Sequence, residues 1–444
     1  MLRLMMPLSA GLVLVGCATY PAAVEQDLPV YERAVIEDDL NAFLDQVKAT
    51  HPDLSYSADL DAVAAKREEI AAALPETMDA REAWMAMAQL NPLFADAHVG
   101  LRRPLDLIAA QADASGAELM TLPVRVTADD RIEVAATSER LPGVEDGATI
   151  VAINGIATET ILADLMPRMR GESELLRALI LALRFDAFFW TAYGAFEGYE
   201  ITVDGEDGRA THTLLPGTAE PANAPYDVRQ LTPRIAYLDV PSFDIAREEE
   251  FAEFLPGAFE AIHHAGATTL IVDIRENTGG ATELSDRLMA FLTDEPYTAT
   301  SKIKARVTEA NQALLPGVPL GAVLDVPFAD AVTPPNDLEH RFTGETVIFI
   351  GPLSYSQSIV FTATAIDAEV ATIAGQPTEG PANQTAQVQI LPLPNTEFQA
   401  LAPLYIITRS SGEEGREVIT PDIPISADGD HGLEELVTVL RNRD

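Results

Sequence analysis

Two short segments of this chain hold residue types that could carry out nucleophilic chemistry. Residues 351–367 (GPLSYSQSIVFTATAID) place Ser356 in a polar turn between an apolar strand and an apolar helix, and residues 95–101 (ADAHVGL) supply His98. A serine hydroxyl is a poor nucleophile until a positioned base removes its proton, and histidine is the usual base. The two segments therefore predict a serine hydrolase in which Ser356 is the nucleophile and His98 is the base.

The elements that must position these residues change in character along the chain. Apolar residues recur every three or four positions up to about residue 118, which predicts helices, and short strands follow. Later, apolar strands alternate with helices, which predicts an α/β fold with a largely parallel sheet covered by helices. We predict a helical domain over 18–118 that carries His98, a β-rich module over 119–226, and a core over 227–444 that carries Ser356.

The N-terminus reads as a targeting segment. Residues 1–17 (MLRLMMPLSAGLVLVGC) contain one arginine and then an apolar run too short to remain as a membrane-spanning helix. The run ends in Leu-Val-Gly-Cys, which resembles the lipobox of bacterial lipoproteins and implies lipidation of Cys17 after removal of the signal peptide. Cys17 is the only cysteine, so an internal disulfide is impossible. We expect a lipid anchor on the periplasmic face of the outer membrane; a plain secretory signal is the alternative.

Composition limits the partners and the chemistry. The chain has 444 residues and a net charge of −40, which disfavours nucleic acid and anionic membrane surfaces as partners. The sequence holds no His-Glu-x-x-His, cysteine cluster, phosphate loop or dinucleotide fingerprint, so we expect no metal or nucleotide cofactor. Lysine is scarce, and none follows Lys304, so a downstream lysine cannot be the base for Ser356.

Several motifs, in order along the chain, resemble the tail-specific, or C-terminal processing, serine peptidases, a family that includes the tricorn core protease. The motifs are HPDLSYSADLD, ADAHVGL, VEDGATIVAINGIATETI, IVDIRENTGG, GPLSYSQSIVF, AGQPTEG and VITPDIPI. The resemblance covers most of the mature chain. It implies an N-terminal helical segment, a PDZ-like module and an α/β core of the ClpP/crotonase-like kind. It also implies that the substrate is a peptide or an unfolded protein.

The catalytic positions depart from the lysine-dependent branch of that family. Pro381 stands where that branch has its lysine, and Ile359 stands where a glutamate usually follows the serine turn. The tricorn-like branch uses an upstream histidine instead, and His98 occupies the matching position. The resemblance implies Glu414 as the third catalytic group, with Glu413 nearly as good a match. Both glutamates could also be solvated loop charges.

The resemblance also implies an oxyanion hole built from the Gly279–Gly280 turn and the N–H of Gln357. Simpler readings exist for each residue. Ser356 could cap the following helix, His98 could be a structural histidine, and the two glycines could merely end a strand. We expect a lipid-anchored periplasmic serine peptidase. The alternatives are a catalytically inert peptide-binding scaffold, which Pro381 and Ile359 keep open, and a hydrolase of small esters or amides.

Overall fold

A computed structural model describes residues 20–443 of the chain. The residues in this range that it does not describe are 25–26, 105–106, 108–119, 128, 137–139, 206–207, 216–224, 329 and 428. Cys17 and the predicted signal peptide lie outside the described residues. Among the helices of the described part, none is both long enough and apolar enough to cross a membrane.

The N-terminal part is helical, as the spacing of its apolar residues predicts. Its elements are β1 (Val30–Glu32), α1 (Arg33–Thr50), η1 (Leu54–Tyr56), α2 (Leu60–Ala73), β2 (Thr77–Asp79), α3 (Ala80–Met87), η2 (Ala88–Phe94) and β3 (Gly100–Leu101). A capping box between Asp79 and Glu82 starts α3. Ala95 adopts a left-handed conformation with φ 46°, which ends η2 and turns the chain toward His98.

The next part forms a sheet in the order β4-β5-β6-β8-β9, with β7 paired to β6. Its elements are β4 (Val124–Val126), β5 (Ile132–Val134), β6 (Thr149–Ile153), β7 (Ile156–Ala157), α5 (Thr158–Leu165), η3 (Met166–Arg168), α6 (Glu174–Leu183), α7 (Phe185–Tyr193), β8 (Tyr199–Gly205) and β9 (Gly208–Leu214). The helices α6 and α7 are separated at Arg184, which leaves the helical conformation (φ −135°, ψ 29°).

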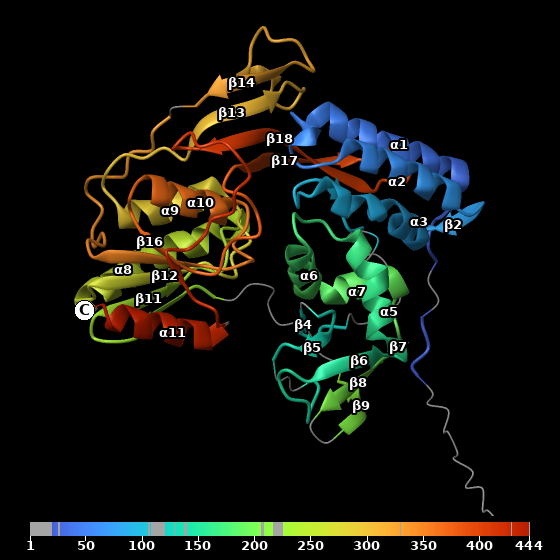
Figure 1. Cartoon of the computed structure of the whole chain (residues 1–444), viewed down its shortest axis with the longest axis horizontal. Coiled ribbons are helices and arrows are strands. Elements are labelled where there is room, and N and C mark those ends of the chain that lie inside the picture. The colour runs from blue at the N-terminus through green and yellow to red at the C-terminus, as the bar shows by residue number, and fades with distance from the viewer. Residues whose placement is uncertain are drawn as a thin grey trace, which may run out of the picture.

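The C-terminal part contains the predicted α/β sheet, in the order β10-β11-β12-β15-β16-β19 (Figure 1). Every neighbouring pair is parallel except β10 and β11. Its strands are β10 (Asp227–Gln230), β11 (Ile235–Asp239), β12 (Thr269–Asp273), β15 (Glu345–Ile350), β16 (Thr372–Gly375) and β19 (Ile423–Pro424), and its helical segments are η4 (Ile245–Arg247), α8 (Glu248–Ala265), α9 (Thr282–Leu292), α10 (Gln357–Asp367) and α11 (Gly429–Arg441). The α/β prediction is confirmed.

Strand alternation explains how the helices cover both faces of this sheet. Leu238 and Leu270 pack with α8, α9 and α10 on one face. Tyr237 and Ile271, one position away along the same strands, pack with α11 on the other face. Because successive side chains of a strand point to opposite faces, each apolar strand serves two layers of helices.

A second sheet joins the core to the N-terminal part. It runs in the order β14-β13-β18-β17 and contains β13 (Thr300–Arg306), β14 (Val323–Pro327), β17 (Gln384–Pro392) and β18 (Gln399–Arg409), with η5 (Gln312–Leu314) before β14. Strand β3 adds to it by pairing Leu101 with Ala400 and Gly100 with Leu401. The segment that carries His98 is therefore tied to the C-terminal part by backbone hydrogen bonds.

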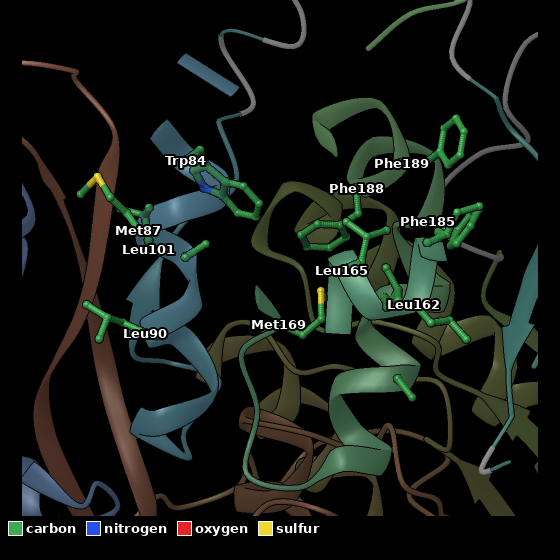
Figure 2. Close-up of a cluster of buried hydrophobic side chains, with 14 of the residues drawn as sticks. Trp84, Met87, Leu90, Leu101, Leu162, Leu165, Met169, Phe185, Phe188 and Phe189 are labelled. Atoms are coloured by element: carbon green, nitrogen blue, oxygen red, sulfur yellow. The ribbon is translucent and has the colours of Figure 1, made fainter. Parts of the chain in front are cut away.

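The helical and β-rich parts share one hydrophobic core. Figure 2 shows Trp84 and Met87 of α3 in the same cluster as Leu165 of α5 and Phe188 of α7. The rings of Trp84 and Phe188 have centroids 6.3 Å apart. Burying these side chains against one another removes a large apolar surface from water, which holds the two parts together. The division of the chain into three domains stays a prediction.

Candidate active site

Ser356 lies at the end of the turn between β15 and α10, where its backbone adopts φ 53° and ψ −121°. A positive φ is uncommon for a residue other than glycine, and such strained conformations concentrate at functional sites. Ser356 occupies the N-cap position of α10, but its side chain makes no capping hydrogen bond. A helix-capping hydrogen bond therefore does not hold the Ser356 hydroxyl.

The two neighbouring serines of the motif, Ser354 and Ser358, are buried inside the protein. Ser354 is fully buried, donates its hydroxyl proton to the carbonyl oxygen of Ile274 at 2.7 Å, and accepts from the N–H of Gly351 at 3.0 Å. Ser358 is also fully buried, within α10. Among the three serines, Ser356 is the one whose hydroxyl meets a base.

That base is His98, whose Nε2 lies 3.0 Å from Ser356 Oγ across 258 positions of sequence. The short loop around His98 is fixed locally by Asp96. Asp96 Oδ1 accepts the backbone N–H of His98 at 2.8 Å, and the Asp96 carbonyl accepts the N–H of Val99 at 3.2 Å. The structure thus brings together the nucleophile and base predicted from the sequence, at hydrogen-bond distance.

The other ring nitrogen of His98 contacts a residue that the sequence did not single out. Nδ1 lies 3.0 Å from Thr385 Oγ1, and the Thr385 hydroxyl donates to Asp96 Oδ2 at 2.8 Å. Because the only hydroxyl proton of Thr385 goes to Asp96, its oxygen accepts the proton of Nδ1. This network assigns the proton of neutral His98 to Nδ1 and leaves Nε2 free to accept the proton of Ser356.

Thr385 lies on β17, which was not predicted from the sequence. The alternation of Ala386, Val388 and Ile390 could have indicated a strand there. No sequence pattern could have indicated that the strand would meet His98, because the two segments are 287 positions apart.

Glu414, expected as the third catalytic group, does not join this network. Its side chain is 75% exposed and its Oε1 pairs with Lys302 Nζ at 2.6 Å. Glu413 is similarly exposed and lies 3.6 Å from Arg409 Nη1. The carboxylate that the structure brings to the His98 ring is that of Asp96, whose Oδ1 is 3.6 Å from Nδ1.

The loop that carries Glu414 contributes a different residue to the neighbourhood of the site. Arg416 donates from Nη2 to the carbonyl of Ala95 at 3.1 Å and from Nη1 to the carbonyl of Tyr56 at 2.8 Å. It thereby joins the segment before His98 to the N-terminal helices. No local sequence pattern indicates this role, since a charged residue in a polar loop is usually solvated.

The predicted oxyanion residues lie against the nucleophile turn. A Cβ added to Gly279 would lie 2.7 Å from both Gln357 N and Ser356 Cβ, so only glycine permits this approach. The Gly279 N–H itself donates to Asn277 Oδ1 at 2.9 Å. Within the described part of the chain, the N–H groups of Gly280 and Gln357 have no acceptor. These two groups are therefore the candidate donors for an oxyanion.

The electrostatics suit His98 as a base. Burial lowers the pKa of His98 below its ordinary value of 6.5, opposed by the negative charge of Asp96 and reinforced by the positive charge of Arg170. Desolvation disfavours the charged imidazolium, so the ring is neutral at neutral pH and can accept a proton.

The two positions that depart from the lysine-dependent pattern have apolar roles. Ile359 is fully buried in the core beneath α10. Pro381 is also buried, and its backbone forms an isolated bridge with Val418. The lysine and the glutamate that these positions lack are not needed to contact the Ser356 hydroxyl, because His98 Nε2 lies 3.0 Å from it.

The comparisons with known proteins agree with this architecture. Residues 234–425 match the model of Peptidase family S41. The structure of mature CPAF is 14% identical with a TM-score of 0.60, over 88% of this chain and 93% of that chain. Mature CPAF complexed with lactacystin gives a TM-score of 0.61 at 14% identity, over 93% and 100%. No curated protein matches the chain in sequence.

These similarities show the fold of the chain and support a serine peptidase. At 14% identity the likeness to CPAF concerns the fold, which it shares over nearly the whole of both chains. The family match identifies residues 234–425 as a peptidase domain of a serine peptidase family, and these residues include Ser356. The predicted resemblance to serine peptidases is thus confirmed at the level of this domain.

Proposed function

We propose that the S41 domain of this chain cleaves peptide bonds through a Ser356–His98 pair, with Thr385 and Asp96 orienting the imidazole. The observation that carries the proposal is the 3.0 Å distance between His98 Nε2 and Ser356 Oγ. The strained backbone of Ser356 and the network from Nδ1 through Thr385 to Asp96 support it. An inert scaffold would have no need to maintain either feature.

In this mechanism Ser356 Oγ attacks the scissile carbonyl carbon while His98 Nε2 takes the hydroxyl proton. The carbonyl oxygen becomes an oxyanion, for which the N–H groups of Gly280 and Gln357 are the candidate donors. The C–N bond then breaks, and His98 returns its proton to the leaving amine. His98 then takes a proton from a water molecule as that water attacks the acyl carbon. The bond between the acyl carbon and Oγ breaks, His98 returns the proton to Ser356 Oγ, and a carboxylic acid product leaves.

The substrate we propose is a peptide or an unfolded protein, held near its C-terminus by the β-rich module. The support for this is the PDZ-like sequence VEDGATIVAINGIATETI, together with the open sheet built from β4 to β9. Strand addition to such a sheet satisfies the backbone of an extended peptide, while its side chains select sequence. A peptidase with this module would prefer long substrates over short ones.

We also propose that the mature protein is anchored in the cell envelope through a lipid on Cys17. The support is the apolar N-terminal run that ends in the lipobox-like Leu-Val-Gly-Cys, together with the fact that Cys17 is the only cysteine in the sequence. Metabolic labelling with a fatty acid tests this, since Cys17→Ser would abolish the label and release the protein from the membrane fraction. A labelled Cys17→Ser variant would contradict the anchor.

The experiment that tests the mechanism is fluorophosphonate labelling of the purified protein beside Ser356→Ala and His98→Ala. We expect the phosphonyl group on Ser356, identified by mass spectrometry, and no label in either variant. Ser411→Ala, which removes an exposed serine hydroxyl of the same domain, is the control and should keep the label. No label on a wild-type protein that is folded by circular dichroism would favour an inert peptide-binding protein.

A second assay separates a peptidase from an esterase. Wild-type protein that has not been treated with the probe is given a denatured protein, a short peptide and a small activated ester. Cleavage of the denatured protein that disappears in Ser356→Ala supports the peptidase. Hydrolysis of the ester alone would support a small-molecule hydrolase with the same pair.

A further inference from the structure

The turn that precedes α6 holds the backbone next to His98. Arg170 donates from Nη1 to the carbonyl oxygen of Ala97, and Glu172 Oε2 accepts the N–H of Ala97 at 3.3 Å. Gly171, between them, has φ 142°, and a Cβ there would lie 3.2 Å from Arg177 Cγ. Both polar backbone groups of the residue before the base are therefore held by one turn from the β-rich part of the chain.

The other carboxyl oxygen of Glu172 reaches the nucleophile turn. Glu172 Oε1 accepts the hydroxyl proton of Tyr355 at 2.7 Å, and Tyr355 directly precedes Ser356. The Tyr355 side chain is buried and its ring centroid lies 5.1 Å from that of His98. A Cβ on Gly380 would come within 2.7 Å of the Tyr355 ring, so the glycine of the AGQPTEG motif makes room for it.

We propose that Glu172 is a positioning residue that sets the separation of the nucleophile and its base. One carboxyl group bridges Ala97, beside His98, to Tyr355, beside Ser356, so that the two turns keep a fixed distance. The proposal rests on the proposed Ser356–His98 mechanism. Glu172 acts through its neighbours, since within the described residues its carboxyl makes no hydrogen bond with Ser356 or with the His98 ring.

The charge state of Glu172 matters to this bridge. Desolvation, together with the negative charge of Asp96, raises the pKa of Glu172 to about 8, against the opposing effects of the Tyr355 hydrogen bond and the positive charge of Arg416. At neutral pH the carboxyl is therefore mainly protonated, and its oxygens still have lone pairs to accept from Ala97 and Tyr355. The titratable and charged groups that face Glu172 are Asp96, Arg170, Tyr355, Arg416 and Tyr56.

Deprotonation of Glu172 would place a second negative charge close to Asp96. Like charges in a poorly solvated site repel strongly, and water would be drawn toward the new carboxylate. The hydrogen bond from Tyr355 favours the carboxylate, but the repulsion from Asp96 would displace the two turns, and the nucleophile would lose its alignment with the base. The chemical step should therefore weaken as the pH rises past about 8.

The test measures kinact and KI of a fluorophosphonate probe from about pH 5.5 to about pH 9.5, a range that spans both limbs of the profile. Glu172→Ala should lower kinact about 10- to 100-fold with KI nearly unchanged, because a small displacement of reacting groups has this effect. Glu172→Gln, whose neutral amide can accept from Ala97 and donate to Tyr355, should retain the neutral-pH rate. It should also lack the fall near pH 8.

Matched variants separate positioning from general damage. Glu174→Gln alters an exposed glutamate two positions away and should behave as wild type in rate and pH profile. Tyr355→Phe should lower kinact, and Glu172→Ala/Tyr355→Phe should be no slower than Glu172→Ala, because both changes break the same bridge. Purely additive losses in this double variant would overturn the proposal.

The remaining outcomes also decide the matter. A wild-type kinact in Glu172→Ala, or the same alkaline fall in Glu172→Gln, would overturn the inference while leaving the Ser356–His98 mechanism intact. If circular dichroism shows that Glu172→Ala does not fold, the inference is tested with Glu172→Gln and Tyr355→Phe. An alkaline fall in Glu172→Gln, or a wild-type kinact in Tyr355→Phe, would then overturn it. An unlabelled wild-type protein would overturn the mechanism, and this inference with it.

Discussion

Thr385 Oγ1 lies 3.0 Å from His98 Nδ1, at the position where a serine peptidase needs a group that orients its base. The hydroxyl accepts from the ring and donates to Asp96, so a carboxylate acts on the imidazole through one intervening hydroxyl. The direct distance between Asp96 Oδ1 and His98 Nδ1 is longer, at 3.6 Å. The orienting unit of the candidate site is therefore a Thr–Asp pair contributed by two distant segments.

This relationship predicts a sharp difference between two substitutions of Thr385. Thr385→Val keeps the shape but removes both hydrogen bonds, and it should lower kinact with a fluorophosphonate about 10- to 100-fold. Thr385→Ser keeps the hydroxyl and should restore most of the rate. Equal rates in the two variants would contradict a role for the hydroxyl.

The acid limb of the pH–rate profile should lie below pH 6.5. Burial lowers the pKa of His98 from that ordinary value, and only the neutral ring can take the proton of Ser356. The rate should therefore rise as the pH increases through a midpoint below 6.5 and reach a plateau before the alkaline fall near pH 8. Asp96→Asn removes the negative charge that raises this pKa, so it should move the midpoint further toward acid. A midpoint above 6.5 in the wild-type protein would argue against the buried, neutral base.

Gly279→Ala should abolish most of the activity. The new Cβ would lie 2.7 Å from Ser356 Cβ, Gln357 N and Tyr355 O, and the backbone has φ 100°. The nucleophile turn must then move away from His98 and from the candidate oxyanion donors, a displacement that should lower kinact about 100- to 1,000-fold. As a control, Gly257→Ala lies on α8, where an added Cβ meets nothing within 4 Å. A fully active Gly279→Ala protein would place the oxyanion hole elsewhere.

Glu414→Gln should leave the rate of labelling within about twofold of wild type, since an exposed ion pair contributes little. Its carboxylate pairs with Lys302 at the surface and does not meet the His98 ring. Asp96→Asn, measured in parallel, should reduce the rate substantially because Asp96 accepts from Thr385. The reverse result would restore Glu414 as the third catalytic group.

Glu172 should also change how the free energy of unfolding depends on pH. Its pKa is about 8 in the folded chain against an ordinary 4.5, so between these values the native state binds a proton that the unfolded state lacks. The free energy of unfolding should then fall as the pH rises through this window, by up to about 1.4 kcal/mol per pH unit from this group. Glu172→Gln should remove that contribution. Urea unfolding of both proteins at several pH values measures the difference, and parallel curves would contradict it.

Several features of the fold and the site followed from local patterns in the sequence. The apolar strand, polar turn and apolar helix around Ser356 predicted β15, the turn and α10, because periodicity and turn residues act over short distances. The same reasoning gave the helices of the N-terminal part and the alternation of strands and helices in the core. His98 came from the resemblance of ADAHVGL to a family motif, and the structure brings it to Ser356.

Other features depended on the tertiary structure. Thr385 and Asp96 are 289 positions apart, and they meet His98 because β3 and β17 both pair with β18, and β17 carries Thr385. The tertiary structure also leaves Glu414 at the surface. It brings Glu172 into contact with Ala97, beside His98, and with Tyr355, beside Ser356. Sequence determined which residue types and local elements were available for chemistry. Only the pairing of distant strands decided which carboxylate would orient the base, since that depends on contacts that no local pattern encodes.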